Sequence, residues 1–417
     1  MAFVSELLVP AGNPEKFYTA VLYGADAVYL GGESGNLRAS GKGFSESDLV
    51  NAVSHARKNG VKIYYCLNAL PFESDMKDLP AAAELAAEAG VDAFIIADPG
   101  VFSVAKRVAP QIPLHLSTQA NTTNADAVKF WLDAGFERVN LARELSCKDI
   151  KAIREKLPES ELEVFVHGAM CLAVSGQCLL SAWLNNRPAN QGRCTQPCRF
   201  EYRATEANIV LEEALRGGER LWDIEQGEQY AAFFAPDDLC LLPFLPWFVK
   251  MGITSLKIEG RMKGASYVAH VTDAYRAAID ACVEAKHGIL SGRDIFDWRL
   301  FFPDLARTAS RPLSSGFFLP KRRYIKGGEI ADHPLVAKVV EEAGPGKWLV
   351  DVRGKWDASM DAELMLPGYR RPTIKSEAYA LENHRGEKTS VVNSGTRAVL
   401  HTDAEGIRPG IFIRSRE

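Results

Sequence analysis

Short apolar, β-rich runs alternate with helical patterns along the first two thirds of the chain, and this alternation limits the possible folds more than any other feature. Runs of strand length occupy residues 6–10, 27–31, 61–67, 92–97, 113–117, 138–141, 162–167 and 254–258. Amphipathic helical spacing occurs between them, for example at 14–23, 46–58, 79–89, 125–134 and 148–155. Strands that alternate with helices form a parallel sheet with helices outside it.

The eight strand runs match the arithmetic of a (β/α)8 barrel. We therefore predict an α/β fold with a TIM-like barrel, and a doubly wound open sheet is the alternative. The last two strands lie about 85 residues apart, between His167 and Thr254. One βα unit is much shorter than this, so we expect an insertion over about residues 168–250 at the barrel mouth.

The pattern changes after about residue 330. Short alternating runs appear at 336–340, 348–352, 362–366, 390–392, 398–401 and 410–414, with Gly and Pro between them. Such runs are typical of a small antiparallel β-barrel or sandwich. We predict a catalytic barrel over residues 1–330 and a small C-terminal β domain over 331–417.

The insertion contains five of the eight cysteines: Cys171, Cys178, Cys194, Cys198 and Cys240. Clustered cysteines in a reducing compartment indicate metal binding or catalysis rather than disulfides. Only Cys194 and Cys198 have the spacing of a zinc knuckle, whereas irregular gaps are commoner around iron–sulfur clusters. We favour a cluster over zinc, and buried thiols without a ligand remain the third alternative.

Four ligands are enough for a cubane cluster. We predict Cys171, Cys178, Cys194 and Cys198 as ligands, with Cys240 as the substitute for Cys198. The other three cysteines, Cys66, Cys147 and Cys282, lie within strand or helix patterns and are predicted to be core residues.

Several motifs resemble those of the collagenase-like peptidase family U32. The central one runs from Glu163 through His167 to Cys171 and continues from Gly176 to Ser181. Further similar runs, in order, occupy residues 6–13, 24–32, 97–100, 115–121, 141–145, 195–199 and 256–262. The resemblance spans roughly residues 5–285, and the C-terminal β region is similar to the accessory domain of longer members.

The resemblance implies either proteolysis or oxygen-independent hydroxylation with a 4Fe-4S cluster. One branch of the family acts on the wobble uridine of tRNA with prephenate as oxygen donor, another on ribosomal RNA, and another on a quinone precursor. The chain length and the small β domain resemble the tRNA branch, which implies tRNA and a small-molecule oxygen donor as partners. The electron donor stays open.

The residues themselves give little support to a protease. The chain has no Gly-x-Ser-x-Gly elbow and no His-Glu-x-x-His zinc motif. A cysteine protease with His167 as base is conceivable, but a cysteine committed to a cluster cannot also be a nucleophile. Peptidase activity is therefore kept as the alternative function, because of the family name.

Polar residues that follow the predicted strands are the candidate site residues, since a barrel places its chemistry at the carboxyl ends of its strands. The candidates for catalysis are Arg143, Glu144, His167, Glu259 and Arg261, and those for substrate binding are Asn68, Gln119, Asn121 and Arg199. Arginine forks match carboxylates, so Arg143 and Arg261 are expected to bind the donor. Glu259 or His167 would move protons. Ordinary ion pairs and a buried core histidine are the alternatives.

An RNA partner would have to bind a local basic patch, because the net charge is −4. Arg187, Arg193, Arg199 and Arg203 lie near Trp183, Phe200 and Tyr202, and residues 321–326 form a second basic run that includes Tyr324. Basic residues interleaved with aromatics suit an unstacked RNA loop, and a solvated surface is the alternative. No apolar stretch approaches a membrane span, so we expect a cytoplasmic protein with no membrane partner.

Overall fold

The computed structural model describes most of the chain, including the whole C-terminal region up to Arg416. The described residues are 4–32, 43–185, 189, 194–199, 225–226, 231–232, 236–286, 296–327 and 333–416.

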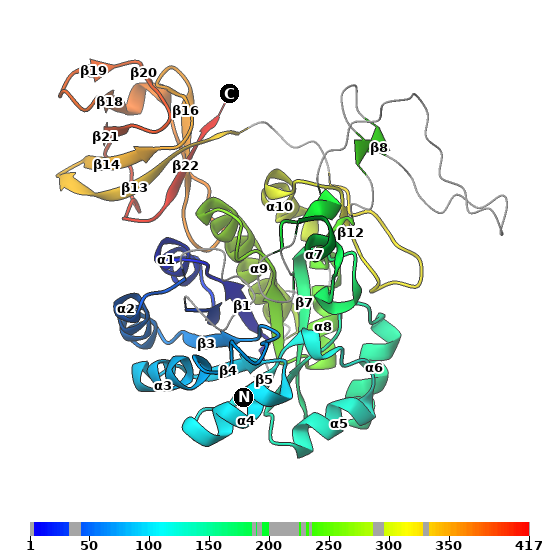
Figure 1. Ribbon diagram of the computed structural model, residues 1–417. Coiled ribbons are helices and arrows are strands. Elements are labelled where there is room, and N and C mark those ends of the chain that lie inside the picture. Colours follow the sequence, from blue (N-terminus) through cyan, green and yellow to red (C-terminus); the bar gives the residue numbers. More distant parts are fainter. Residues whose placement is uncertain are drawn as a thin grey trace.

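Eight parallel strands close into a barrel (Figure 1). They are β1 (Glu6–Pro10), β2 (Ala27–Leu30), β3 (Lys62–Leu67), β4 (Ala93–Ile96), β5 (Leu114–Leu116), β6 (Arg138–Asn140), β7 (Glu161–Ala169) and β11 (Ser255–Ile258). The last strand, β11, pairs with β1 on one side and with β7 on the other, both in parallel. This closure confirms the predicted barrel and rules out the open sheet.

A helix follows each of the first six strands, and two more flank β11. They are α1 (Pro14–Leu22), α2 (Glu46–Lys58), α3 (Leu79–Ala89), α4 (Pro99–Val108), α5 (Ala125–Asp133), α6 (Cys147–Lys156), α8 (Leu245–Met251) and α9 (Ala265–Lys286). Side-chain caps start several of them: Asn13, Ser45, Asp98, Asn124 and Ser146 each accept a backbone N–H of the first turn. The apolar faces of the helices pack on the barrel to form the main core.

The barrel interior is unusually polar for this fold, in which branched aliphatic residues normally fill the centre. The Arg138 guanidinium forms ion pairs with Glu6 at 2.6 Å and Glu163 at 3.8 Å. The other oxygen of Glu163 accepts from Lys257 Nζ at 2.7 Å. A connected set of buried charges therefore runs through the barrel centre.

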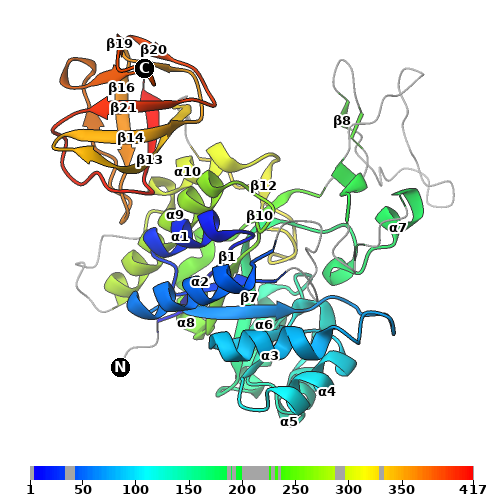
Figure 2. The same cartoon turned by 60° about the vertical axis from the view of Figure 1, so that its left-hand side comes forward.

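The predicted insertion between the last two barrel strands is present. Its described elements are η2 (Val174–Gly176), α7 (Leu180–Asn185), η4 (Pro197–Arg199), β8 (Glu225–Gln226), β9 (Ala231–Ala232) and β10 (Asp238–Cys240). Strand β10 returns to the barrel and pairs antiparallel with the end of β7, and β12 (Leu313–Ser314) extends this sheet. Figure 2 shows β8 and α7 projecting to the side of the barrel away from the C-terminal sheet.

The C-terminal region is a curled antiparallel sheet with its own core around the fully buried Trp356. Its strand order is β17-β16-β22-β13-β14-β21-β18-β19. Their bounds are β13 (Leu335–Gly344), β14 (Lys347–Val352), β16 (Asp361–Met365), β17 (Thr373–Ile374), β18 (Ala380–Glu382), β19 (Lys388–Thr389), β21 (Arg397–His401) and β22 (Phe412–Arg416). A short pair, β15 (Trp356–Asp357) and β20 (Val391–Val392), completes it.

Buried polar contacts join this sheet to α9 and to α10 (Phe302–Thr308). Asp304 of α10 lies 2.6 Å from Arg414 and 2.7 Å from Arg371, and Arg371 also contacts Asp273 of α9 at 2.7 Å. The Tyr23 hydroxyl donates to Met365 O at 2.8 Å.

No helix in the described part of the chain is long and apolar enough to cross a membrane.

Candidate active site at the barrel mouth

A pocket of about 150 Å³ lies at the carboxyl ends of the barrel strands. Its floor is formed by residues of six barrel strands: Tyr29, Cys66, Ile95, Asn140, Phe165 and Lys257. A larger hollow of about 560 Å³ adjoins it and shares Arg143, Cys171, Cys194, Cys198 and Glu259 with it. We call these the inner pocket and the outer pocket. Their place in the barrel is where enzymes of this fold carry their chemistry.

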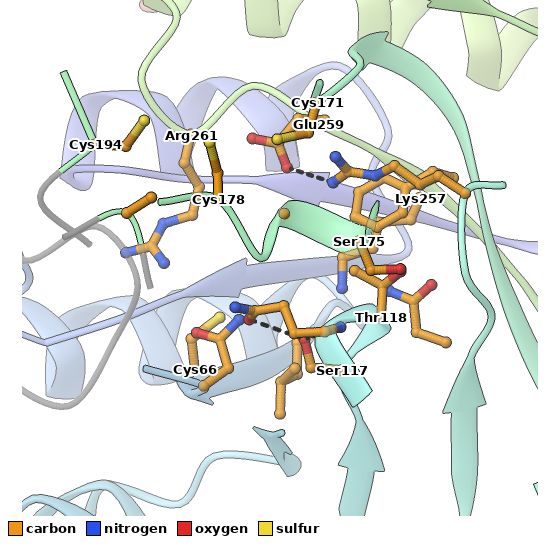
Figure 3. Close-up of a pocket in the computed structure, with 18 of the residues that line it drawn as sticks. Cys66, Ser117, Thr118, Cys171, Ser175, Cys178, Cys194, Lys257, Glu259 and Arg261 are labelled. Atoms are coloured by element: carbon orange, nitrogen blue, oxygen red, sulfur yellow. Dashed lines mark hydrogen bonds and ion pairs between the residues drawn. The ribbon is translucent and has the colours of Figure 1, made fainter. Parts of the chain in front are cut away.

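The four predicted cluster ligands all line the inner pocket. Figure 3 shows Cys171, Cys178 and Cys194 along one side of it, with Cys66 and Ser117 opposite. The alternative ligand, Cys240, lies elsewhere. It is fully buried in β10, burial raises the pKa of its thiol to about 12, and its side chain bonds to Tyr275 of α9. The geometry thus places Cys198, not Cys240, with the other three cysteines.

The cysteine loops have the chemistry that an iron–sulfur cluster requires. Two sulfur atoms accept backbone N–H bonds from the residue two positions on: Cys178 Sγ from Leu180 N at 3.4 Å, and Cys194 Sγ from Gln196 N at 3.3 Å. Such bonds stabilise thiolates and tune cluster potentials. Among the described residues, no three His, Cys, Asp or Glu side chains converge closely enough for a single metal ion. Cysteine thiolates are soft donors, which suit zinc, copper(I) and iron–sulfur clusters.

Hydrogen bonds from the barrel hold the cysteine loops in place. Glu144 accepts from Ser175 N at 2.8 Å and from Ser175 Oγ at 3.1 Å, between Cys171 and Cys178. The fully buried Ser181 of α7 accepts from Thr195 N at 2.9 Å, which ties the segment after Cys178 to the segment after Cys194. Glu144, predicted as catalytic, is thus placed as a loop-positioning residue.

Arg143 and Glu259 form the charged pair of the site. Arg143 Nη2 lies 3.4 Å from Glu259 Oε2, and both residues line both pockets. The guanidinium also lies over the Phe165 ring, 3.9 Å from its centre. Gly168 has a φ of +105°, and a Cβ there would lie 2.4 Å from Glu259 O. Only glycine lets the end of β7 approach Glu259 this closely.

Arg261 lines the inner pocket on the same side as Cys178 and Cys194 (Figure 3). Its carbonyl oxygen accepts from Lys16 Nζ at 2.9 Å, which ties the segment after β11 to α1. Two arginines, Arg143 and Arg261, therefore border one cavity beside the cysteines, as the prediction of a carboxylate-binding pair requires.

His167 does not line either pocket. It lies fully buried between Tyr267 and Tyr275, and burial lowers its pKa to about 3. The register of β7 against β11 shifts between Lys257 and Ile258, which face Phe165 and His167. A bulge changes the side to which the following side chains point. His167 accordingly faces Tyr267 and Tyr275 of α9 and not the pocket. The placement corresponds to the buried core histidine that was the alternative to catalysis.

The other predicted residues divide between the pocket and its surroundings. Asn68 and Gln119 line the inner pocket, whereas Asn121 does not. The side chains of Arg199 and Trp183 lie outside the described residues, as do Arg187, Arg193, Phe200, Tyr202 and Arg203. The second basic run is described: Lys321, Arg322, Arg323, Tyr324 and Lys326 are all exposed.

Sequence reasoning missed the floor of the pocket. Lys257 and Asn140 are both nearly fully buried and line it. Their signal was available, because Lys257 lies two positions before Glu259 and Asn140 two positions after Arg138. In a strand, residues two apart face the same side. A polar residue two positions from another in a buried strand therefore indicates an interior site.

Comparison with known proteins finds relatives that are named for tRNA hydroxylation, for rRNA hydroxycytidine synthesis and for collagenase activity. The chain is 34% identical to the tRNA hydroxylation protein P of Escherichia coli, over 92% of this chain and 90% of that protein. It is 32% identical to the 23S rRNA 5-hydroxycytidine C2501 synthase of Escherichia coli (76% and 46% covered). It is also 32% identical to a collagenase of Porphyromonas gingivalis (76% and 74%).

The family comparison agrees with the sequence motifs. A model of the family described as Peptidase family U32 matches residues 12–327. This range covers the barrel from α1 onward, the cysteine insertion and both pockets. The chain therefore belongs to peptidase family U32.

Proposed function

We propose that this protein is an RNA hydroxylase that converts the wobble uridine of tRNA to 5-hydroxyuridine without dioxygen. The observation that carries the proposal is the inner pocket, which the four predicted ligand cysteines line together with Arg143, Arg261 and Glu259. The similarity to a tRNA hydroxylation protein over nearly the whole of both chains supports the choice of substrate.

Cys171, Cys178, Cys194 and Cys198 would hold a 4Fe-4S cluster, and a bound cluster would supply electron transfer to the reaction. The backbone N–H bonds to Cys178 and Cys194 would stabilise the thiolates. Ser181 and Glu144 would keep the two cysteine loops together before the cluster binds. This preorganisation lowers the entropy cost of assembling a site from distant segments.

Arg143 and Arg261 would bind the oxygen donor, for which prephenate, a dicarboxylate, is our candidate. Guanidinium groups bind carboxylates through two parallel hydrogen bonds. Arg143 is held by the Phe165 ring and by Glu259. Glu259 is the residue best placed to move a proton, because its carboxylate borders both pockets. Binding of an anionic donor to Arg143 would weaken the Arg143–Glu259 pair and free that carboxylate.

The exposed run from Lys321 to Lys326 would contact the RNA backbone. An isolated bridge joins Tyr324 to Ser314 of β12, close in sequence to Ser310 and Arg311, which line the outer pocket. The Arg322 guanidinium lies 5.5 Å from the centre of the Tyr324 ring. Exposed cations beside an aromatic ring suit a single-stranded loop.

A peptidase is the alternative function, and the collagenase name among the relatives favours it. The described lining of the inner pocket contains Ser117 and Ser175 as hydroxyl nucleophiles but no histidine to activate them. Hydroxylase chemistry therefore uses more of the pocket's residues than proteolysis does.

The proposal is tested by nucleoside mass spectrometry of tRNA from bacteria that lack their own relative and express this chain. We expect 5-hydroxyuridine with the wild type and none with Cys194→Ala. Cys147→Ala is the matched control, because Cys147 begins α6 and lines neither pocket. Unmodified wobble uridines with the wild type would contradict the substrate, and full activity of Cys194→Ala would contradict the role of the cysteines.

A further inference from the structure

Asn140 has a side-chain amide that is buried and unused. The residue is 2% exposed and lies at the end of β6 in the floor of the inner pocket. Within the described chain, neither Asn140 Oδ1 nor Asn140 Nδ2 has a hydrogen-bond partner. Burying such groups without partners costs about 1–3 kcal/mol each, so an amide in this state requires a partner, either an ordered water or a bound molecule.

Several neighbouring polar groups have partners elsewhere. Asn140 pairs in register with Glu163 on β7. Glu163 Oε1 accepts from Lys257, and Glu163 Oε2 lies 3.8 Å from Arg138 but has no hydrogen-bond partner among the described residues. On the other side, Ser117 follows β5 and its hydroxyl donates to Gln119 Oε1 at 3.3 Å. Thr118 Oγ1 donates to Leu141 O at 3.0 Å. The free donor and acceptor of Asn140 are therefore left to a molecule that enters the pocket.

The shape and lining of the pocket favour a flat, single-ring ligand. The cavity has a volume of about 150 Å³ and adjoins the larger outer pocket. Its floor combines the Phe165 and Tyr29 rings and Ile95 with the polar side chains of Asn140 and Lys257. Aromatic and apolar side chains together with hydrogen-bonding groups are what enzymes use to hold a base that has been turned out of its stack.

We propose that Asn140 binds the Watson–Crick edge of the flipped pyrimidine, an inference that rests on the proposed RNA hydroxylation and names the residue that holds the base. A carboxamide presents an acceptor next to a donor, and uracil presents N3–H next to O4. Asn140 Oδ1 would accept from N3–H, and Asn140 Nδ2 would donate to O4. Binding at this edge leaves C5 of the base free for reaction.

Both pyrimidines are relevant, because one relative is named for hydroxycytidine and another for tRNA hydroxylation. An amide can turn over and pair with cytosine as well as with uracil, whereas a carboxylate can only accept. Asn140→Asp keeps one bond, from N3–H of uracil or from the amino group of cytosine, and sets its second oxygen against O4 of uracil or N3 of cytosine. Asn140 is a base-binding residue in this proposal, and Glu259 and the cysteines remain the reactive groups.

Binding of fluorescently labelled anticodon stem-loops, measured by anisotropy, tests the contact without turnover. One RNA carries uridine at the target position, and its partner carries N3-methyluridine, which lacks the N3–H. We expect methylation to weaken binding to the wild type about tenfold, the effect of one buried hydrogen bond, and to have no effect on Asn140→Ala. Equal losses in both proteins would mean that Asn140 holds only buried water, and would overturn the proposal.

A second arm uses the isosteric Asn140→Asp, with stem-loops carrying uridine or cytidine. We expect Asn140→Asp to bind both RNAs about tenfold more weakly than the wild type, because one hydrogen bond is lost with either base. Asn124→Asp is the matched control, because Asn124 caps α5 outside the pocket and aspartate caps equally well. Unchanged affinity of Asn140→Asp for both RNAs would refute the base contact. If the wild type hydroxylates no tRNA in cells, the proposed function fails instead, whatever these binding data show.

Discussion

Glu144 fixes Ser175 in a left-handed backbone conformation. Ser175 has a φ of 45°, which non-glycine residues adopt at a cost, and both carboxylate oxygens of Glu144 accept hydrogen bonds from it. The carboxylate therefore holds the loop between Cys171 and Cys178 in a conformation that it would not keep alone.

Glu144→Ala should accordingly lower the iron content rather than the folding of the barrel. Loss of the two bonds leaves Ser175 free to relax, with a local cost of about 1–3 kcal/mol. We expect anaerobically purified Glu144→Ala to retain less than about half the wild-type iron, with a melting temperature within a few degrees of wild type. Glu155→Ala on the exposed face of α6 is the control. Full iron occupancy in Glu144→Ala would contradict the positioning role.

Iron and sulfide assays of single cysteine variants decide between Cys198 and Cys240. Cys198→Ala should lose the cluster absorbance, because this cysteine lines the inner pocket with the other three. Cys240→Ala should keep it, since Cys240 is buried in β10 against Tyr275. The opposite pattern would make Cys240 the fourth ligand.

The buried pair Lys257–Glu163 predicts a non-additive effect on stability. Lys257→Met leaves the Glu163 carboxylate, 2% exposed, without its nearest cation and with only Arg138 at 3.8 Å, and we expect a loss of about 3–5 kcal/mol. The double variant Lys257→Met/Glu163→Gln should recover most of this loss. The free energy of unfolding from urea titrations measures both. Additive effects would show that the two side chains do not interact.

Arg143 and Glu259 should affect different kinetic constants. Arg143→Lys keeps the charge but loses the planar fork, so we expect the KM for the carboxylate donor to rise about tenfold with a smaller change in kcat. Glu259→Gln cannot move a proton, and kcat should fall about 100-fold. Steady-state assays at varied donor concentration separate the two. A shared rise in KM alone would leave Glu259 as a binding group.

Stability should fall as the pH drops below about 6.5, and His270 contributes to this fall together with the buried His167. Burial lowers the pKa of His270 to about 4, and its ring bonds to Ser266 O and Arg414. A histidine in the unfolded chain has a pKa near 6.5. Between that pH and the pKa of the folded protein, the unfolded state binds a proton that the folded state does not, and the free energy of unfolding falls. The loss should reach about 3 kcal/mol near pH 4.

His270→Gln removes this titration. Its urea-unfolding free energy should depend less on pH between 7 and 4 than that of the wild type. Parallel curves for the two proteins would assign the acid sensitivity to other groups, such as Asp304, whose pKa Arg371 and Arg414 lower against the opposing effect of burial.

The barrel was predictable because its strands are continuous apolar runs with glycine-ended helices between them. Each predicted barrel strand is present, with its ends within two residues of those observed. In the C-terminal region, β15, β17, β18 and β19 were not predicted, because strands of two or three residues carry too little alternation. Strand β10 escaped for the same reason, and its pairing with β7 depends on tertiary contacts.

The site was predictable only in its outer part. The cysteines and the charged residues after β6 and β11 are visible as motifs. Simple alternation from Phe165 places His167 in the pocket, but the bulge on β7 reverses its direction. Asn140 was not predicted as a site residue, because a single asparagine belongs to no recognisable motif. Only the structure shows that both of its amide atoms are buried without hydrogen-bond partners in the described chain.

The ionic contacts of Asp273 and Asp304 with the C-terminal sheet have a consequence for how such chains diverge. The carboxylates lie on two helices, Asp273 on α9 and Asp304 on α10, yet the arginines closest to them, Arg371 and Arg414, come from the C-terminal region. A descendant that lost residues 333–416 would carry two newly exposed acidic positions, one on each helix. We expect shorter relatives to have uncharged residues at both positions. The residue types at these two positions would then distinguish barrels that evolved with the C-terminal sheet from barrels that evolved without it.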